Sequence, residues 1–204
     1  MSGARKLSGG QASTPLIDRI ARSLVADPPH DLLPGDLVEG EDGEPHLAAV
    51  LVAITDRPEP GLILTVRREH LRNHAGQVAF PGGRIDEGET AVRAALREAR
   101  EELALDPEVV QILGEADQYR TVTGYGVTPV VGLVPPDLDL TPNPEEVADW
   151  FEAPLDFVLD PINQRRMTAE YKGRMRNYYQ IDWQGRPIWG ATAAMLVNLT
   201  RRIA

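Results

Sequence analysis

"GETAVRAALREAREELAL", residues 88–105, predicts a helix that has an unusual distribution of charge. Thr90 can cap its N-terminus, and Asp106-Pro107 ends it, since a proline moves the residue before it out of the α region. At about 100° per residue, the apolar side chains form one narrow stripe that we expect to face the core. That stripe consists of Val92, Leu96, Ala99 and Leu103.

The carboxylates Glu98, Glu101 and Glu102 share another face of this helix, close to the negative end of its dipole. Like charges at i,i+3 and i,i+4 each cost a few tenths of a kcal/mol. Arg97 can pair with Glu101, but no cation stands one turn from Glu98 or Glu102. A solvated charged face is the ordinary explanation of a charge run, but this spacing favours an external cation. Carboxylate oxygens select hard divalent ions, so the pattern predicts Mg²⁺ or Mn²⁺.

The whole chain limits the possible partners. Its 204 residues suit one domain, and a net charge of -10 argues against nucleic acid or an anionic membrane as the main partner. The absence of cysteine excludes disulfides, thiolate nucleophiles and cysteine zinc sites. The longest apolar run, at 47–54, is far shorter than the roughly 18 residues that span a bilayer. With no hydrophobic segment typical of a signal peptide at the start, we expect a cytoplasmic protein.

The element pattern predicts an α/β fold of α/β/α layers. Residues 1–13 are small and polar and are expected to be a flexible tail, with a single domain over 14–204. Thr14 and Pro15 can start a first helix over 14–27, and a connecting loop follows to residue 45. Strands are expected at 47–55 and 61–67, which form a hairpin, and at 77–80, 109–117 and 126–134. A strand edge that runs into a short helix is expected over 147–159. A second hairpin, of 177–183 and 186–190, and a closing helix at 191–203 follow.

The segment 83–105, "GRIDEGETAVRAALREAREELAL", resembles the Nudix box. The matching positions are Gly83, Glu89, Arg97, Glu98, Ala99, Glu101, Glu102 and Leu105. The one departure is Ala104, where the pattern has glycine, and it implies either a different helix exit or a strain of about 1 kcal/mol. The resemblance implies a Nudix-type α/β/α sandwich with a mixed sheet, followed by a C-terminal extension.

The resemblance also implies roles for these residues. Glu98, Glu101 and Glu102, with the carbonyl of Gly83, would bind the metal, while Arg97 would orient a carboxylate such as Glu89. Glu101 is favoured as the base that takes a proton from water. Alternatives for that base are Glu145 and Glu146, although exposed capping is the more ordinary role for those two.

The preceding segment, 62–83, resembles the additional motif of the coenzyme A pyrophosphatase branch of that family. The matches are Thr65, Arg67, Leu71, Arg72, His74, Gly76, Gln77, Val78, Phe80, Pro81, Gly82 and Gly83. The stretch "IWGATA" at 188–193 is similar to the C-terminal segment of that branch. The implied reaction splits the diphosphate of coenzyme A or acyl-coenzyme A into 3',5'-ADP and a 4'-phosphopantetheine product. A pyrophosphatase of ADP-ribose or dinucleotides, and a non-catalytic nucleotide-binding regulator, remain alternatives.

A basic patch precedes the box, in a chain that is acidic as a whole. It contains Arg67, Arg68, His70, Arg72 and His74, with Glu69 as the one acid. Such a patch can attract a ligand with a diphosphate and a 3'-phosphate, although a solvated surface loop is the plainer interpretation. We expect Arg67 and Arg72 to contact phosphate, and His74 and Gln77 to shape the loop or touch the diphosphate.

Two aromatic residues and one basic stretch are also interpreted from the sequence. Phe80 is expected in the core, and Trp189 is placed there in preference to a role in stacking on adenine. The basic stretch 164–176 is expected to be solvated or to form a subunit contact, which makes a homodimer possible.

Overall fold

The computed structural model describes residues 15–36, 43–68, 76–171 and 173–204. The predicted tail at 1–13 and the cap Thr14 lie outside these ranges, as do Arg72 and His74. The helices are α1 (Pro15–Val25), α2 (Ala91–Leu103), α3 (Leu155–Leu159) and α4 (Ala191–Arg202), with 3-10 turns at Pro107–Val109 and Pro161–Asn163. The strands are β1 (His46–Thr55), β2 (Gly61–Arg67), β3 (Val78–Ala79), β4 (Gly82–Arg84), β5 (Gln111–Glu115), β6 (Tyr119–Arg120), β7 (Tyr125–Val134), β8 (Val147–Pro154), β9 (Arg165–Tyr171), β10 (Arg174–Trp183) and β11 (Arg186–Trp189).

A mixed sheet forms the centre of the fold, as predicted. β1 runs parallel to β7 over its whole length, from His46 opposite Tyr125 to Thr55 opposite Val134. β1 also meets β2 as the expected antiparallel hairpin, with Ile54 opposite Leu62, and β8 completes the other edge of β2. β3 pairs with β2 whereas β4 pairs with β1, so the segment 78–84 crosses from one strand to the other.

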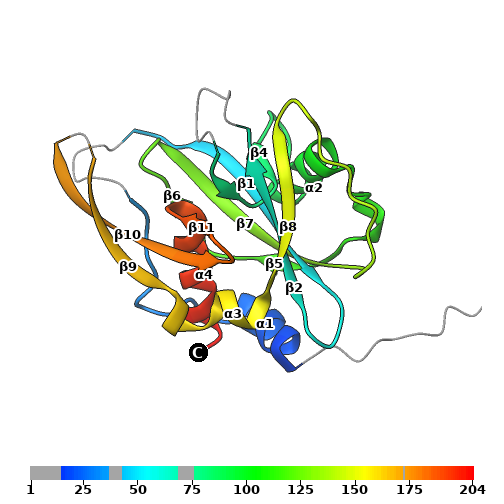
Figure 1. Ribbon diagram of the computed structural model, residues 1–204, viewed down its shortest axis with the longest axis horizontal. Helices are drawn as coiled ribbons and strands as arrows, with labels where there is room; N and C mark the ends of the chain where they lie inside the picture. Colours follow the sequence, from blue (N-terminus) through cyan, green and yellow to red (C-terminus); the bar gives the residue numbers. More distant parts are fainter. Residues whose placement is uncertain (1–14, 37–42, 69–75, 172) are drawn as a thin grey trace, which may run out of the picture.

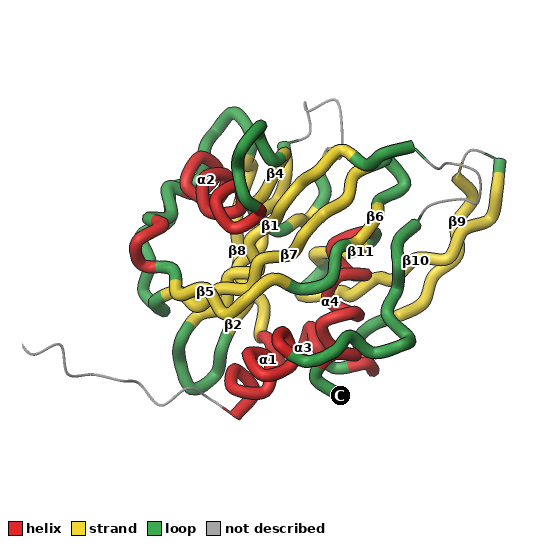
Figure 2. The backbone as a smooth tube through the Cα atoms, turned by 180° about the vertical axis from the view of Figure 1, so that it is seen from behind, coloured by secondary structure: helices red, strands yellow, loops and turns green. Residues whose placement is uncertain are grey.

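The sheet is covered on both faces. Alternate residues of β1 enter two separate apolar clusters, with Leu51 in one and Val52 in the other. The first cluster contains the buried alanines of α2, and the second contains the apolar side chains of α1, α3 and α4. Figure 1 shows α2 on one side of the sheet and the other three helices opposite, and Figure 2 shows the same arrangement from behind. The α/β/α sandwich is therefore confirmed.

A second, three-stranded sheet follows, in the order β11-β10-β9. The predicted hairpin at 177–190 is present, but β10 begins three residues earlier and β9 was not predicted. β9 and the first three residues of β10 lie in the stretch 164–176, which composition alone assigned to a solvated or subunit-contact segment. In Figure 1 this hairpin extends along the side of α4 and away from the large sheet. No helix in the described ranges is long and apolar enough to cross a membrane.

Candidate active site

Helix α2 has the predicted ends. Thr90 caps it by accepting a hydrogen bond from the Arg93 amide at 3.3 Å. At the other end, Ala104 adopts the left-handed conformation with φ 56° and ψ 24°, and its amide donates to the Arg100 carbonyl at 2.9 Å. The helix exit therefore keeps the geometry that glycine would adopt without strain. Of the two possibilities for Ala104, strain is the one the structure shows.

The predicted stripe of α2 faces the core, but the buried side of the helix is wider than that stripe. Val92 and Leu96 are only partly buried, whereas Ala94, Ala95 and Glu102 are buried with Ala99 and Leu103. Small alanine side chains let the helix approach β1 and β4 closely, and this approach carries Glu102 inward. The three carboxylates consequently range from the core to solvent: Glu102 is 2%, Glu98 15% and Glu101 53% exposed.

Arg97 is the centre of an ion-pair network on the outer side of α2. Its Nε and Nη2 donate to the two carboxylate oxygens of Glu89, each at 3.1 Å, so the expected contact with Glu89 is present. Nη1 donates to Glu98 Oε1 at 2.8 Å and lies 3.4 Å from Glu101 Oε2. Nη2 also donates to the carbonyl of Arg84 at 2.9 Å, which ties the helix to β4. The hydrogen bonds from Arg97 lower the pKa of Glu89, and those to Glu89 raise the pKa of Arg97.

Glu102 is the most buried acid of the cluster. Its Oε2 accepts the Gly82 amide at 3.3 Å, and its Oε1 lies 3.7 Å from Arg67 Nη1. Burial, together with the charges of Glu98 and Glu146, raises the pKa of Glu102 to about 8, although Arg67 and the Gly82 amide act to lower it. Its negative charge is therefore poorly compensated in the folded chain.

The negative charge of Glu98 is also poorly compensated, but less so than that of Glu102. Burial raises the pKa of Glu98, and Arg97 offsets part of that rise, while Glu101 and Glu146 add to it. Of the two alternative bases suggested by sequence, Glu146 thus acts on the cluster. Glu145 is exposed, and its own amide donates to the Asn143 side chain.

Gly83 makes the closest approach between β4 and α2. A Cβ atom at this position would lie 2.4 Å from the Glu98 carboxylate carbon and from its Oε1. A side chain at position 83 would therefore displace the Glu98 carboxylate. The adjoining Gly82 is equally tight, because its Cβ would lie 2.4 Å from the Ala49 carbonyl oxygen.

The charge and chemistry of this cluster suit a divalent cation. Glu98 and Glu102 are buried carboxylates with raised pKa values, and the oxygen donors around them are of the type that Mg²⁺ and Mn²⁺ prefer. Within the described ranges, no three acidic or histidine side chains already converge as a metal cage. Arg97 holds Glu98 and Glu101 toward itself instead. The metal ligands therefore remain a prediction.

The basic patch reaches the acidic cluster through Arg67, at the end of β2. The Arg67 amide donates to the Gln77 carbonyl at 2.9 Å, so the two predicted substrate residues face each other across the strands. Arg67 Nε is buried and has no acceptor in the described part of the chain, and the same holds for Arg68 Nε. The other two predicted substrate residues, Arg72 and His74, lie outside that part, so their role is untested.

The two aromatic predictions have opposite outcomes. Phe80 is 3% exposed and belongs to the core, as predicted. Trp189 is 40% exposed, so its assignment to the core is wrong. β11 turns Ile188 inward, and the alternation of a strand therefore turns Trp189 outward.

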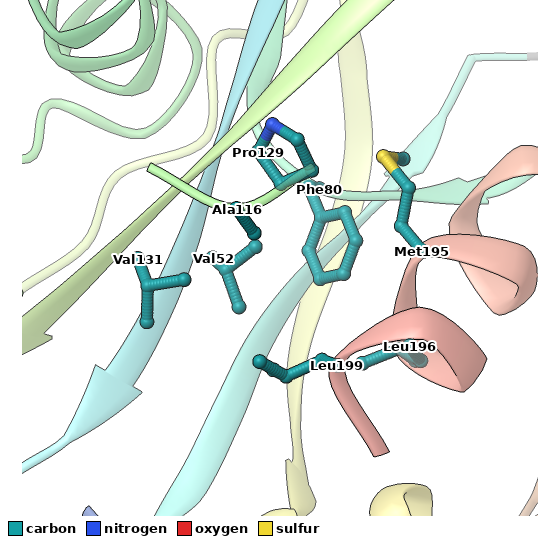
Figure 3. A pocket seen from close by; sticks show the side chains of 8 residues that line it. All are labelled: Val52, Phe80, Ala116, Pro129, Val131, Met195, Leu196 and Leu199. Atoms are coloured by element: carbon teal, nitrogen blue, oxygen red, sulfur yellow. The ribbon is translucent and has the colours of Figure 1, made fainter. Parts of the chain in front are cut away.

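A small void lies elsewhere, in the core between β1, β7 and α4 (Figure 3). Its volume of about 10 Å³ holds one water at most, and its lining is apolar. The lining side chains are Val52, Phe80, Ala116, Pro129, Val131, Met195, Leu196 and Leu199. It offers no polar group for chemistry, which leaves the acidic cluster as the candidate site.

The chain is similar to known proteins over most of its length. The model of the NUDIX domain matches residues 45–172. A protein of Escherichia coli O7:K1 called "Uncharacterized Nudix hydrolase NudL" is 44% identical over 157 residues, which cover 76% of this chain and 82% of that protein. The protein of the same name from Cronobacter sakazakii is also 44% identical, with the same coverage.

Two similar solved structures each cover a smaller share of the chain. RenU, a Nudix hydrolase from M. smegmatis, is 26% identical with a TM-score of 0.49, over 56% of this chain and 74% of that one. The C. elegans Ap4A hydrolase is 21% identical with a TM-score of 0.44, over 53% of this chain and 80% of that one.

Proposed function

This chain belongs to the Nudix hydrolase family, and from that premise we propose that it cleaves the diphosphate of coenzyme A and its derivatives. With coenzyme A, water would add to one phosphorus and the bond to the bridging oxygen would break. The products are 3',5'-ADP and 4'-phosphopantetheine.

The contact between Arg67 and Glu102 is the observation that supports this substrate. Arg67 belongs to the segment that resembles the coenzyme A branch, and its Nη1 lies 3.7 Å from the buried carboxylate of the Nudix helix. The segment that would select the substrate and the helix that would cleave it therefore meet at one point. Arg67 Nε lacks an acceptor in the described ranges, and a phosphate oxygen would supply one.

Metal binding and the positioning of the carboxylates are assigned to separate residues of the chain. A bound Mg²⁺ or Mn²⁺ would neutralise phosphate oxygens and make water more acidic. Glu98, Glu102 and Glu101, with the Gly83 carbonyl, would hold the ion. Arg97 fixes Glu89 and Glu98 in position through its hydrogen bonds.

Proton transfer requires a carboxylate at the open side of the cluster. Glu101 is 53% exposed and shares Arg97 with Glu98, so it can meet a water molecule at the edge of the site. We propose Glu101 as the base, with Glu146 as the alternative because its charge acts on Glu98 and Glu102.

A substrate panel tests the proposal. Coenzyme A, dephospho-coenzyme A and ADP-ribose are compared at two salt concentrations, and the products are identified. Coenzyme A should have the highest kcat/KM, by about tenfold for each 1.4 kcal/mol of differential transition-state binding. Its advantage over dephospho-coenzyme A should shrink as salt rises, because exposed charges are screened over roughly 10 Å at 0.1 M.

Three results count against the assignment. Equal rates for coenzyme A and dephospho-coenzyme A would remove the 3'-phosphate from recognition. Faster turnover of ADP-ribose would transfer the chain to the ADP-ribose pyrophosphatases, and no turnover of any substrate would favour a non-catalytic regulator.

A further inference from the structure

The outer face of the small sheet carries an apolar row that the core does not use. Gln180 stands opposite both Trp189 and Arg165, so these three side chains share one face of β9, β10 and β11. Tyr178, two positions along β10, stands opposite Met167 and therefore lies on the same face. We call Met167, Tyr178 and Trp189 the outer row.

The opposite face of this sheet is the one that packs against α4. Ile181 and Ile188 stand opposite each other there, are fully buried, and belong to the core cluster that contains α4. The outer row therefore has no structural role in that core. α4 contacts both β10 and β11 and lies beside them in Figure 1.

Two members of the outer row are exposed, Trp189 at 40% and Met167 at 37%, and Tyr178 is partly buried. The rings of Trp189 and Tyr178 meet edge to face, with centroids 6.0 Å apart and an interplanar angle of 67°. The described part of the chain places no aromatic ring flat against the indole. Single exposed apolar side chains are ordinary, but an exposed indole braced by a second ring is a ready stacking surface.

Trp189 lies next to the segment that carries the candidate active site. β11 contacts β3, and the Thr192 hydroxyl, three residues after Trp189, donates to the Val78 carbonyl at 3.2 Å. Four residues beyond Val78, the Gly82 amide donates to Glu102. An extended chain covers this interval in about 13 Å. β11, which carries the indole, and the Glu102 carboxylate therefore contact the two ends of one short segment, 78–82.

We propose that Trp189 stacks on the adenine ring of the nucleotide half of the substrate, with Tyr178 holding the indole in place. An aromatic side chain binds the flat face of a base by dispersion and quadrupole interactions. Arg165, exposed in the same cross-strand row, gives this face a positive charge that suits a phosphorylated nucleoside. The inference rests on the proposed function only in requiring a substrate with an adenosine diphosphate group.

Binding of the product 3',5'-ADP tests the stacking without any turnover. Isothermal titration calorimetry is carried out with Mg²⁺ on the full chain. The change Trp189→Ala should raise the Kd of 3',5'-ADP about tenfold, which is 1.4 kcal/mol. Trp189→Phe retains an aromatic face and should stay within about threefold of the wild type. The Kd of 4'-phosphopantetheine, which has no base, should not change.

Met175→Ala is the matched control. Met175 is 68% exposed on the same hairpin, but it stands opposite Glu170 on the other face of the sheet. Its loss should leave the Kd of 3',5'-ADP unchanged. In steady-state assays, Trp189→Ala should raise KM for coenzyme A and leave kcat unchanged, because stacking acts equally in ground and transition states.

The outcomes separate this inference from the proposed function. An unchanged Kd in Trp189→Ala, an equal weakening of 4'-phosphopantetheine, or no binding of 3',5'-ADP to the wild type would each overturn the stacking. If ADP-ribose is the better substrate but Trp189→Ala still weakens 3',5'-ADP, the substrate assignment fails and the stacking stands. If the chain hydrolyses coenzyme A but Trp189→Ala leaves the Kd of 3',5'-ADP unchanged, the substrate assignment stands and the stacking fails.

Discussion

The change Glu102→Gln removes a buried charge and should make the metal-free protein more stable at neutral and higher pH. Glu102 is 2% exposed, and its carboxylate has one amide donor and a cation at 3.7 Å. Glutamine keeps the shape of the side chain and an oxygen that can accept the Gly82 amide. It removes the charge that burial makes unfavourable.

The magnitude follows from the pKa of Glu102, which is about 8 in the folded chain against an ordinary value of 4.5. Since the folded value is the higher one, the native state binds more protons than the unfolded state between these two pH values. The free energy of unfolding therefore falls as pH rises from 4.5 to 8, by up to about 1.4 kcal/mol per unit. Glu102→Gln lacks this fall, so its advantage should grow to as much as about 5 kcal/mol by pH 8.

Urea denaturation in EDTA at pH 5, 6, 7 and 8 measures this difference. Glu101→Gln is the matched control, because the same charge is removed one residue earlier at a position that is 53% exposed. Its stability relative to the wild type should vary little with pH, since solvent screens that carboxylate. Adding Mg²⁺ should stabilise the wild type more than Glu102→Gln. A difference between Glu102→Gln and the wild type that stays flat from pH 5 to 8 would refute the reasoning.

Four further changes have definite expected outcomes. Ala104→Gly should raise the free energy of unfolding by up to about 1 kcal/mol in urea, because φ is 56° at this position, and lower stability would contradict the strain. Glu98→Gln should cut turnover by about a hundredfold or more without lowering the metal-free Tm, and near-normal turnover would exclude its metal role. Gly83→Ala should lower turnover, because its Cβ would displace the Glu98 carboxylate, whereas Gly43→Ala, with no atom within 4 Å of its Cβ, should not. Arg72→Ala should lower kcat/KM for coenzyme A, mainly through a higher KM, by a factor that corresponds to more than about 1 kcal/mol of transition-state binding. An unchanged kcat/KM would mean that Arg72 is a solvated surface residue.

Local signals in the sequence predict the central elements well. The Thr90 cap and the Pro107 stop delimit α2, and the apolar runs of β1, β2 and β7 predict the centre of the sheet. These signals depend on neighbours along the chain, which sequence patterns report directly.

The burial of Glu102 was not predictable in the same way. An isolated helix gives no reason to place a carboxylate inward, since acidic side chains are rarely buried. The inward side is set by how closely Ala95 and Ala99 allow α2 to approach β1, which is a tertiary property. Val92 and Leu96 face the core as predicted, but the close approach at the alanines leaves them only partly buried.

The small sheet also depends on tertiary contacts. β9 is exposed on both faces and rich in charge, so it lacks the alternation that marks a strand. β9 forms a strand because it pairs with β10. Trp189 was misplaced because hydrophobicity predicts burial, whereas its position in β11 turns it outward.

The parallel pairing of β1 with β7 has a consequence for the folding kinetics. His46 meets Tyr125, so joining the two strands closes a loop of roughly 80 residues, at an entropic cost of about 4 kcal/mol plus a constant. Such non-local pairing slows folding, and the enclosed loop contains the whole of α2 and β4. In a nascent chain, β1 therefore gains its parallel partner only after α2 and β4 have been synthesised. In pulse-labelled hydrogen exchange during refolding, the amides of β1 and β7 should become protected in the same slow phase.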